Sequence, residues 1–122
     1  MKNTISLIII LLSFSINAQT EAELIGKWKL VKWTQNGKEK NLQDHFHTDQ
    51  VFQVFLEKKH QFQSLTGEDV HKGKWKLSSD GKSLTIIAGI LPIVFSIDYF
   101  DAKKRVITQE TLGTLEYEKV PG

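Results

Sequence analysis

The pentad Gly-Lys-Trp-Lys-Leu occurs twice in this chain, at residues 26–30 and again at 73–77. In each copy glycine, tryptophan and leucine alternate with lysines, and side chains two residues apart on a β-strand point to the same face. Each pentad therefore predicts a strand with one apolar face around Trp28 or Trp75 and one solvated face of lysines. Two such strands in a chain of 122 residues favour a sheet curled around a single core.

Residues 1–18 have the layout of a secretory signal peptide. Lys2 supplies a basic start, Ile5 to Ile16 form an apolar stretch interrupted only by serines, and Ala18 is a small residue at the expected cut. The stretch is shorter than the ~20 residues that span a bilayer. We expect cleavage after Ala18 and export, to the periplasm or outside the cell, with no transmembrane segment left. The alternatives are an uncleaved N-terminal anchor or a buried helix.

The composition fits one domain over residues 19–122 that is held together by packing alone. The chain has no cysteine, which excludes disulfides, thiolate catalysis and thiolate metal sites. A formal net charge of +2 lacks the basic excess of a dedicated nucleic-acid-binding domain, so no nucleic-acid partner is predicted. The three tryptophans and the six phenylalanines of residues 19–122 are then the largest pieces of the core.

Turn signals recur throughout residues 19–122 and divide this domain into short strands. Asn36-Gly37 and Asp80-Gly81 suit hairpin turns with positive φ. Short connections favour antiparallel neighbours, and closure of a meander into a barrel removes its exposed edges. We therefore predict an all-β, antiparallel, eight-stranded up-and-down barrel, with a short helical turn around Leu42 to Phe46. The predicted strands are roughly 24–34, 51–56, 60–65, 70–78, 83–88, 93–100, 105–110 and 114–120.

A meander of this kind sorts its loops between two ends of the barrel. The floor turns are short and charged, whereas the mouth carries the one long loop and an apolar tip at residues 89–92. Because function usually lies on loops carried by a rigid scaffold, we expect the working end to be the mouth. The mouth loops are 35–50, 66–69, 89–92 and 111–113, and the floor turns are 57–59, 79–82 and 101–104.

The same alternation brings both pentad tryptophans to the floor. Trp28 lies early in a strand that leaves the floor, and Trp75 lies late in a strand that returns to it. Arg105, the only arginine, opens another strand at this end. A guanidinium over an indole is a favourable cation–π contact, so we expect these three residues to close the floor together. The alternative is that Arg105 is one more solvated charge beside Lys103 and Lys104.

The segment Leu24 to Val31 resembles the Gly-x-Trp opening of the lipocalins, most closely that of small exported lipocalin-like domains of bacteria. Gly26 and Trp28 carry the resemblance. In that family the motif lies at the closed end of an eight-stranded barrel, which is where the order of strands places Trp28. The resemblance therefore implies a calycin-type barrel that binds a small apolar molecule in its interior.

Two further lipocalin motifs have partial counterparts in this chain. The family's Thr-Asp-Tyr motif lies between the sixth and seventh strands, and here Asp98-Tyr99 stands near that junction, with Ile97 in place of threonine. The family's third motif supplies an arginine that packs across the tryptophan. Arg105 is the only candidate, one strand earlier than in the family. The resemblance implies that Asp98 and Arg105 are structural residues of the floor.

The barrel interior is the first candidate for a functional site. An eight-stranded barrel either holds one small ligand or is filled by its own side chains. Trp33 breaks the parity set by Trp28 and Leu30, so either it follows a bulge and turns inward near the mouth or it covers outer surface. Residues predicted to bind a small hydrophobic molecule are Trp33, Phe46, Phe52, Val54, Phe62, Ile86, Phe95 and Ile97.

Metal binding and catalysis are weaker candidates. His45 and His47 share one loop with two aspartates, and His-x-His is a workable pair of metal ligands. Only His71, with Glu68 or Asp69, approaches that loop in the predicted topology, so solvated loop histidines are the preferred interpretation. No nucleophile–base spacing, phosphate-binding glycine loop or dinucleotide fingerprint is present. We predict no metal, no cofactor and no enzymatic activity.

The predicted function is non-enzymatic binding of a small hydrophobic ligand inside an exported barrel. The alternative is a filled barrel that acts as a protein-interaction or inhibitor module through its mouth loops. The tip Ile90-Leu91-Pro92 favours a protein partner, because exposed apolar tips mark contact sites. Otherwise this tip folds over the mouth as a lid or packs on Phe46.

Overall fold

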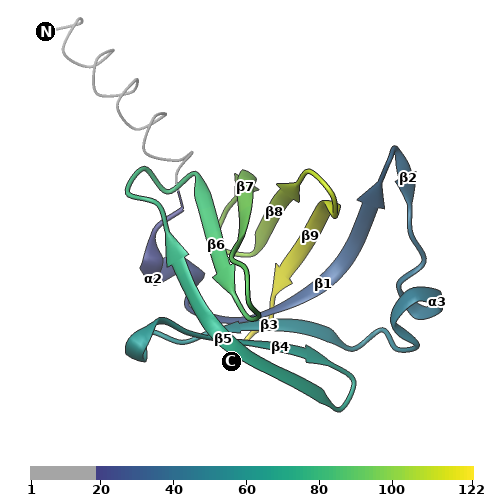
Figure 1. Cartoon of the computed structure of the whole chain (residues 1–122), viewed down its shortest axis with the longest axis horizontal. Coiled ribbons are helices and arrows are strands. Elements are labelled where there is room, and N and C mark those ends of the chain that lie inside the picture. The colour runs from purple at the N-terminus through teal and green to yellow at the C-terminus, as the bar shows by residue number, and fades with distance from the viewer. Residues whose placement is uncertain (1–18) are drawn as a thin grey trace, which may run out of the picture.

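The computed structural model describes residues 19–122, and the signal peptide predicted over 1–18 lies outside the described residues. The chain forms one antiparallel sheet that closes on itself (Figure 1), because β1 pairs with β3 on one side and with β9 on the other. The strands are β1 (Gly26–Gln35), β2 (Lys38–Glu39), β3 (Val51–Phe55), β4 (Gln61–Thr66), β5 (Asp69–Leu77), β6 (Ser83–Ile87), β7 (Ile93–Phe100), β8 (Lys104–Gln109) and β9 (Gly113–Lys119).

The predicted all-β barrel is confirmed, and the eight predicted strands correspond to β1 and β3 to β9. The additional strand β2 pairs only with the end of β1. It follows the predicted Asn36-Gly37 turn, whose two residues have φ angles of 53° and 77°. Paired positive φ angles match the right-handed twist of a hairpin, which explains the tight return of the chain.

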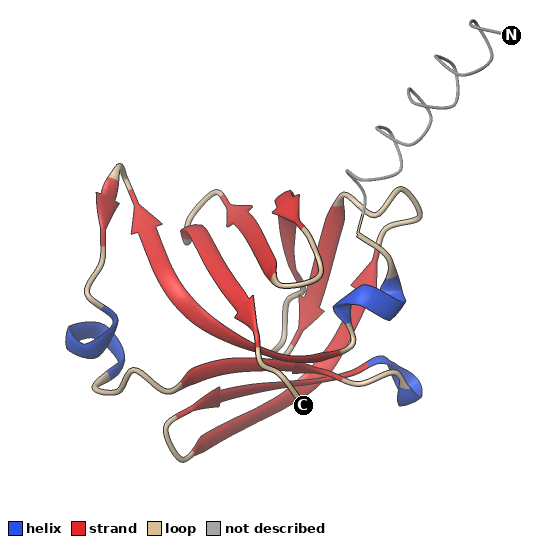
Figure 2. Ribbon diagram, turned by 180° about the vertical axis from the view of Figure 1, so that it is seen from behind, coloured by secondary structure: helices blue, strands red, loops and turns tan. Residues whose placement is uncertain are grey.

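Three short helices accompany the strands within residues 19–122: α2 (Glu21–Leu24), α3 (Leu42–Phe46) and the 3₁₀ turn η1 (Lys58–His60). The helical turn predicted over Leu42 to Phe46 is α3, where the side chain of Asn41 accepts a hydrogen bond from the Asp44 N–H. Figure 2 shows α2 and α3 on opposite sides of the barrel, at the two ends of β1. These helices mark the floor and the mouth, respectively.

Strand β1 changes its inward face part-way along its length. Its pairing with β9 shifts register between Leu30 and Lys32, and Trp28, Leu30 and Trp33 are all buried. A bulge inserts one residue and reverses the parity of those that follow. The alternative in which a bulge turns Trp33 inward is therefore the correct one, and it delivers an indole to the mouth end of the interior.

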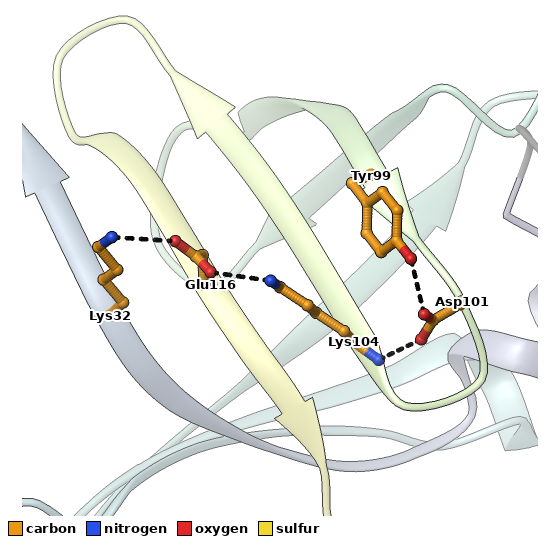
Figure 3. Close-up of polar contacts among 5 residues, drawn as sticks. All are labelled: Lys32, Tyr99, Asp101, Lys104 and Glu116. Atoms are coloured by element: carbon orange, nitrogen blue, oxygen red, sulfur yellow. Dashed lines mark hydrogen bonds and ion pairs between the residues drawn. The ribbon is translucent and has the colours of Figure 1, made fainter.

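A row of polar contacts crosses the outer face beside the β1–β9 seam (Figure 3). Lys32 Nζ and Lys104 Nζ lie 3.9 and 3.3 Å from the carboxylate of Glu116, between β1 and β8. The Lys104 N–H and the Tyr99 hydroxyl both donate to Asp101, at 2.7 and 2.8 Å. Exposed ion pairs contribute at most about 1 kcal/mol each, so this row supports the seam without determining the fold.

The floor is closed by side chains from both termini of the barrel. Trp28 is fully buried, and its indole N–H donates to the Leu24 carbonyl at 2.9 Å. Lys119 Nζ lies 4.7 Å from the Trp28 ring centroid. Gly26 has a φ of +130°, a backbone conformation that residues with a Cβ rarely adopt, so this position favours glycine. The predicted structural role of Gly26 and Trp28 at the floor agrees with these contacts.

Arg105 is part of the core and not a solvated charge. Its side chain is fully buried, and its guanidinium carbon lies 5.0 Å from the Trp28 ring centroid. Trp75 is also buried, but it contacts Phe55 and stacks on His60, with ring centroids 6.0 and 4.3 Å apart. The predicted floor cluster is thus correct for the Arg105–Trp28 pair, while Trp75 joins it through Phe55.

The prediction that Asp98 belongs to the floor is wrong. Its side chain is exposed on the outer face of β7, where Ser96 and Thr108 both donate hydrogen bonds to it. The pairing of β7 with β8 shifts register between Ile97 and Tyr99, so Asp98 occupies an irregularity in the strand. An ionised carboxylate without a buried partner is far more stable in water than in a core, which accounts for this placement.

Candidate functional site

A cavity of about 240 Å³ occupies the mouth half of the barrel interior. The floor half is filled by packed side chains, including Trp28, Phe55 and Arg105. The interior is therefore hollow in its mouth half and filled in its floor half, so each of the two alternatives is correct for one half. The cavity is lined by Leu30, Trp33, His45, Phe46, Val51, Phe52, Gln53, Ser64, Thr66, Phe95, Leu112, Leu115 and Tyr117.

An aromatic cluster forms the outer rim of the cavity. Trp33 Nε1 donates to the Leu112 carbonyl at 2.7 Å, which fixes the indole between β1 and the loop before β9. The long loop brings α3 against this indole, with the His45 ring 4.5 Å and the Phe46 ring 5.8 Å from it, centroid to centroid. The bulge in β1 turns Trp33 inward, and the capped helix α3 positions His45 and Phe46. Together they place three rings at the opening of the cavity.

Two polar side chains of the cavity wall lie at its inner end, toward the floor. They are Gln53 and Tyr117, and both also contact Arg105 of the floor. Arg105 Nη2 donates to Gln53 Oε1 at 2.6 Å, and the guanidinium carbon lies 4.5 Å from the Tyr117 ring centroid. Gln53 and Tyr117 therefore lie between Arg105 and the cavity. The positive charge of Arg105 acts on the cavity through these two side chains.

Burial shifts the pKa values of both ionisable groups at this end. Desolvation lowers the pKa of Arg105 to about 10, an effect that Tyr117 opposes. Desolvation also raises the pKa of Tyr117 to about 12, and the charge of Arg105 opposes that shift. At neutral pH the site therefore holds a guanidinium cation and a protonated phenol, so both groups are hydrogen-bond donors.

Strand β3 faces the interior with the opposite parity to the one predicted. Val51, Gln53 and Phe55 are the buried residues, whereas Phe52 and Val54 are only half-buried. The Phe52 ring lies on the Lys27 side, with the ammonium 4.3 Å from its centroid, although Phe52 still contributes to the cavity wall. The interior placement is therefore wrong for Val54, whereas Phe52 is half-buried and still lines the cavity as predicted. Apolar residues occur on both faces of β3, and Gln53 turns inward because it bonds Arg105.

The eight residues predicted to bind a ligand separate into two groups. Trp33, Phe46, Phe52 and Phe95 line the cavity. Phe62 and Ile86 are buried in the core, Ile97 packs against that core, and Val54 is half-buried on β3. Gln53 also lines the cavity, and it was missed from the sequence because a polar amide side chain predicts an outward position.

Two of the four histidines, His45 and His60, make aromatic contacts in this structure. His45 packs edge-on against Trp33, and His60 stacks on Trp75 with an interplanar angle of 18°. Across residues 19–122, no three histidine, aspartate or glutamate side chains gather in a group that could hold a metal ion. Imidazole rings here extend the aromatic packing at both ends of the barrel.

Comparison with known proteins found no matching family model, no matching curated protein and no matching solved structure. In the part of the chain that the structure describes, no helix has the length and apolar composition needed to cross a bilayer.

Proposed function

We propose that this protein binds a small, largely apolar molecule non-covalently inside the barrel, without catalysis. The observation that carries the proposal is the cavity of about 240 Å³ at the mouth, whose wall is mainly aliphatic and aromatic. Sites for small molecules are concave and mostly apolar, with a few placed polar groups, and usually span about 300–1,000 Å³. A cavity just below that range favours a small ligand.

We also propose that the chain belongs to the lipocalin-like, calycin-type barrels. Three features support it: the closed antiparallel barrel, the Gly-x-Trp segment at its filled end, and Arg105 packed against Trp28. Export through residues 1–18 belongs to the same proposal, and it would put ligand binding in the periplasm or outside the cell.

Calorimetric titration with 1-octanol, a small neutral amphiphile, tests the binding proposal. Ser64 lines the cavity, so Ser64→Leu fills part of it and is expected to weaken octanol binding at least ~10-fold, by loss of apolar contact and space. Gln63→Leu adds the same side chain on the opposite face of β4 and should leave binding unchanged. Equal octanol affinity in all three proteins would overturn the proposal, as would no binding of either octanol or octanoate.

A second candidate function is supported by the loop between β6 and β7. Ile90 is 99% exposed and Leu91 is 76% exposed, so this tip neither packs on Phe46 nor covers the mouth in the described structure. Exposed apolar tips favour a protein partner. Affinity capture from the compartment that holds the protein would test this: a partner lost with Ile90→Ser plus Leu91→Ser, but retained with Val31→Ser, is the supporting result. A partner retained by the double variant would contradict it.

A further inference from the structure

The buried guanidinium of Arg105 has no counter-charge. Within residues 19–122, no carboxylate lies within ion-pair distance of it, and its Nε and Nη1 atoms are buried without a hydrogen-bond partner. Gln53 supplies the one side-chain acceptor that it contacts in this part of the chain. The rings of Trp28, Phe55 and Tyr117 surround the guanidinium and offset part of its desolvation, but a buried charge without an opposite charge still costs several kcal/mol. This cost points to a role in binding.

Gln53 links Arg105 to the cavity, because it accepts a hydrogen bond from the guanidinium and also lines the cavity wall. The guanidinium only donates hydrogen bonds, so the carbonyl oxygen of the Gln53 amide must face Arg105. The amide nitrogen of Gln53 is then left to donate elsewhere, and Gln53 belongs to the cavity wall. Hydrogen bonds in a chain polarise one another, so a donor bonded to a cation is strengthened. Tyr117 adds a hydroxyl that stays protonated at neutral pH.

We propose that the ligand carries one carboxylate, which docks at the inner end of the cavity against Gln53 and Tyr117 and offsets the charge of Arg105. This inference rests on the proposed ligand-binding function and specifies its ligand class. The Gln53 amide and the Tyr117 hydroxyl donate to the carboxylate, and the guanidinium supplies the opposite charge behind them. The apolar remainder of the ligand lies along Leu30 and Leu115 toward the rim at Trp33.

The charge and size of the site both limit the ligand. One buried cation balances one negative charge, so a monoanionic carboxylate fits better than a doubly charged phosphate. A volume of about 240 Å³ corresponds to roughly eight groups the size of a water molecule, each taking about 30 Å³ in the liquid. The ligand class is therefore a monocarboxylic acid with a chain of up to about eight carbons or a single ring, and a long-chain lipid would extend past the rim.

The test compares octanoate, 1-octanol and octylamine, which share one alkyl chain and differ in the charge of the head. Binding of each is measured by calorimetry at pH 7.5 with the whole mature protein. A hydrogen bond to a charged group is worth about 1.5–3 kcal/mol, which corresponds to roughly 10- to 100-fold in affinity. Octanoate should bind at least ~10-fold more tightly than octanol, and octylamine should bind most weakly.

Two variants locate the effect. Gln53→Glu places a carboxylate of the protein's own beside Arg105 and should remove the preference for octanoate while octanol still binds. Gln61→Glu adds the same charge at an exposed position of β4 and should change neither affinity. Arg105→Met removes the cation in an apolar replacement of a kind that proteins often tolerate, and it should also abolish the preference. Circular dichroism checks that each protein is folded.

The outcomes separate this inference from the function on which it rests. A preference for octanoate that is lost in folded Gln53→Glu or Arg105→Met protein supports the anionic ligand. Octanol binding as tightly as octanoate in the unsubstituted protein overturns the inference and leaves the proposed function standing. A preference that survives both substitutions overturns it as well. If none of the three probes binds, the proposed function itself fails.

Discussion

At the scale of single residues, the floor depends on a few large side chains that are tied by polar atoms. Trp28 combines complete burial, a hydrogen bond to the Leu24 carbonyl and contacts with two cations, Arg105 and Lys119. An indole with its N–H satisfied can be buried without a polar penalty. Trp28 therefore buries a large apolar surface in a fixed orientation, and its hydrogen bond to Leu24 holds α2 against the barrel.

Trp28→Ala should lower the free energy of unfolding by about 3–5 kcal/mol, since a large buried ring leaves a cavity and two cations lose their aromatic partner. Val31→Ala is the control, because Val31 is exposed on the same strand and should change stability by no more than about 0.5 kcal/mol. Urea denaturation measures both. A loss below about 1 kcal/mol for Trp28→Ala would show that the floor does not depend on this ring.

Tyr117 offers a titration that reports on the buried site. Because its pKa is raised to about 12, the folded protein holds its proton more tightly than the unfolded chain, whose tyrosines ionise near pH 10. Its contribution to stability is fully present below about pH 10 and is lost as the pH rises through about 12. Over the same range the lowered pKa of Arg105 acts in the opposite direction, so spectroscopy is a better probe than stability.

Ultraviolet absorbance of phenolate should isolate this group in a Tyr99→Phe protein, which has Tyr117 as its only tyrosine. A pKa of about 12 means that about 10% of Tyr117 is ionised at pH 11, against about 90% in the urea-unfolded chain. Circular dichroism at pH 11 confirms that the protein is still folded. Half-ionisation near pH 10 in the folded protein would place Tyr117 in contact with water.

At the scale of elements, the pattern of apolar residues and turns predicted the strands well, because short antiparallel connections leave few alternatives. The helix α3 was also predictable, since Asn41 supplies a cap. Which residues of a strand face the interior was predictable only where one face of the strand is clearly polar. In β3 both faces carry apolar side chains, and the inward position of Gln53 depends on Arg105, which is 52 residues away in sequence. Such a partner leaves no local signal.

The hairpin from β8 to β9 requires glycine at residue 113. Gly113 has a φ of +93°, and a Cβ there would lie 2.2 Å from the Thr34 carbonyl oxygen of β1. Gly113→Ala should cost more than about 2 kcal/mol of unfolding free energy, from backbone strain and displacement of the closing strand. Gly89→Ala is the matched control, since a Cβ at Gly89 has nothing within 4 Å. Equal melting temperatures for the two variants would contradict this account of the seam.

At the scale of the whole molecule, the barrel is solid at one end and hollow at the other. The residue types at the two ends account for this: tryptophan, phenylalanine and arginine fill the floor, while Ser64 and Thr66 leave space near the mouth. The sequence indicated which end carries the long loop, but not the cavity. A void depends on the summed volumes of side chains from several strands, which no single strand reveals.

Export makes a prediction about the mature chain. If residues 1–18 act as a signal peptide, intact-mass measurement of the protein from its natural host should give the mass of residues 19–122. The structure is compatible with a start at Gln19, whose N–H donates to the Gly81 carbonyl at 3.2 Å. A mass that includes residues 1–18 would contradict cleavage and would favour an uncleaved anchor.

The central claim, a ligand inside the mouth half of the barrel, is tested most directly by intermolecular nuclear Overhauser effects from bound octanoate. The account predicts contacts from the alkyl protons to the methyl groups of Leu30 and Leu115, which line the cavity from β1 and β9. Contacts restricted to the exposed methyl groups of Ile90 and Leu91, with none to Leu30 or Leu115, would place the ligand outside the barrel and contradict the claim.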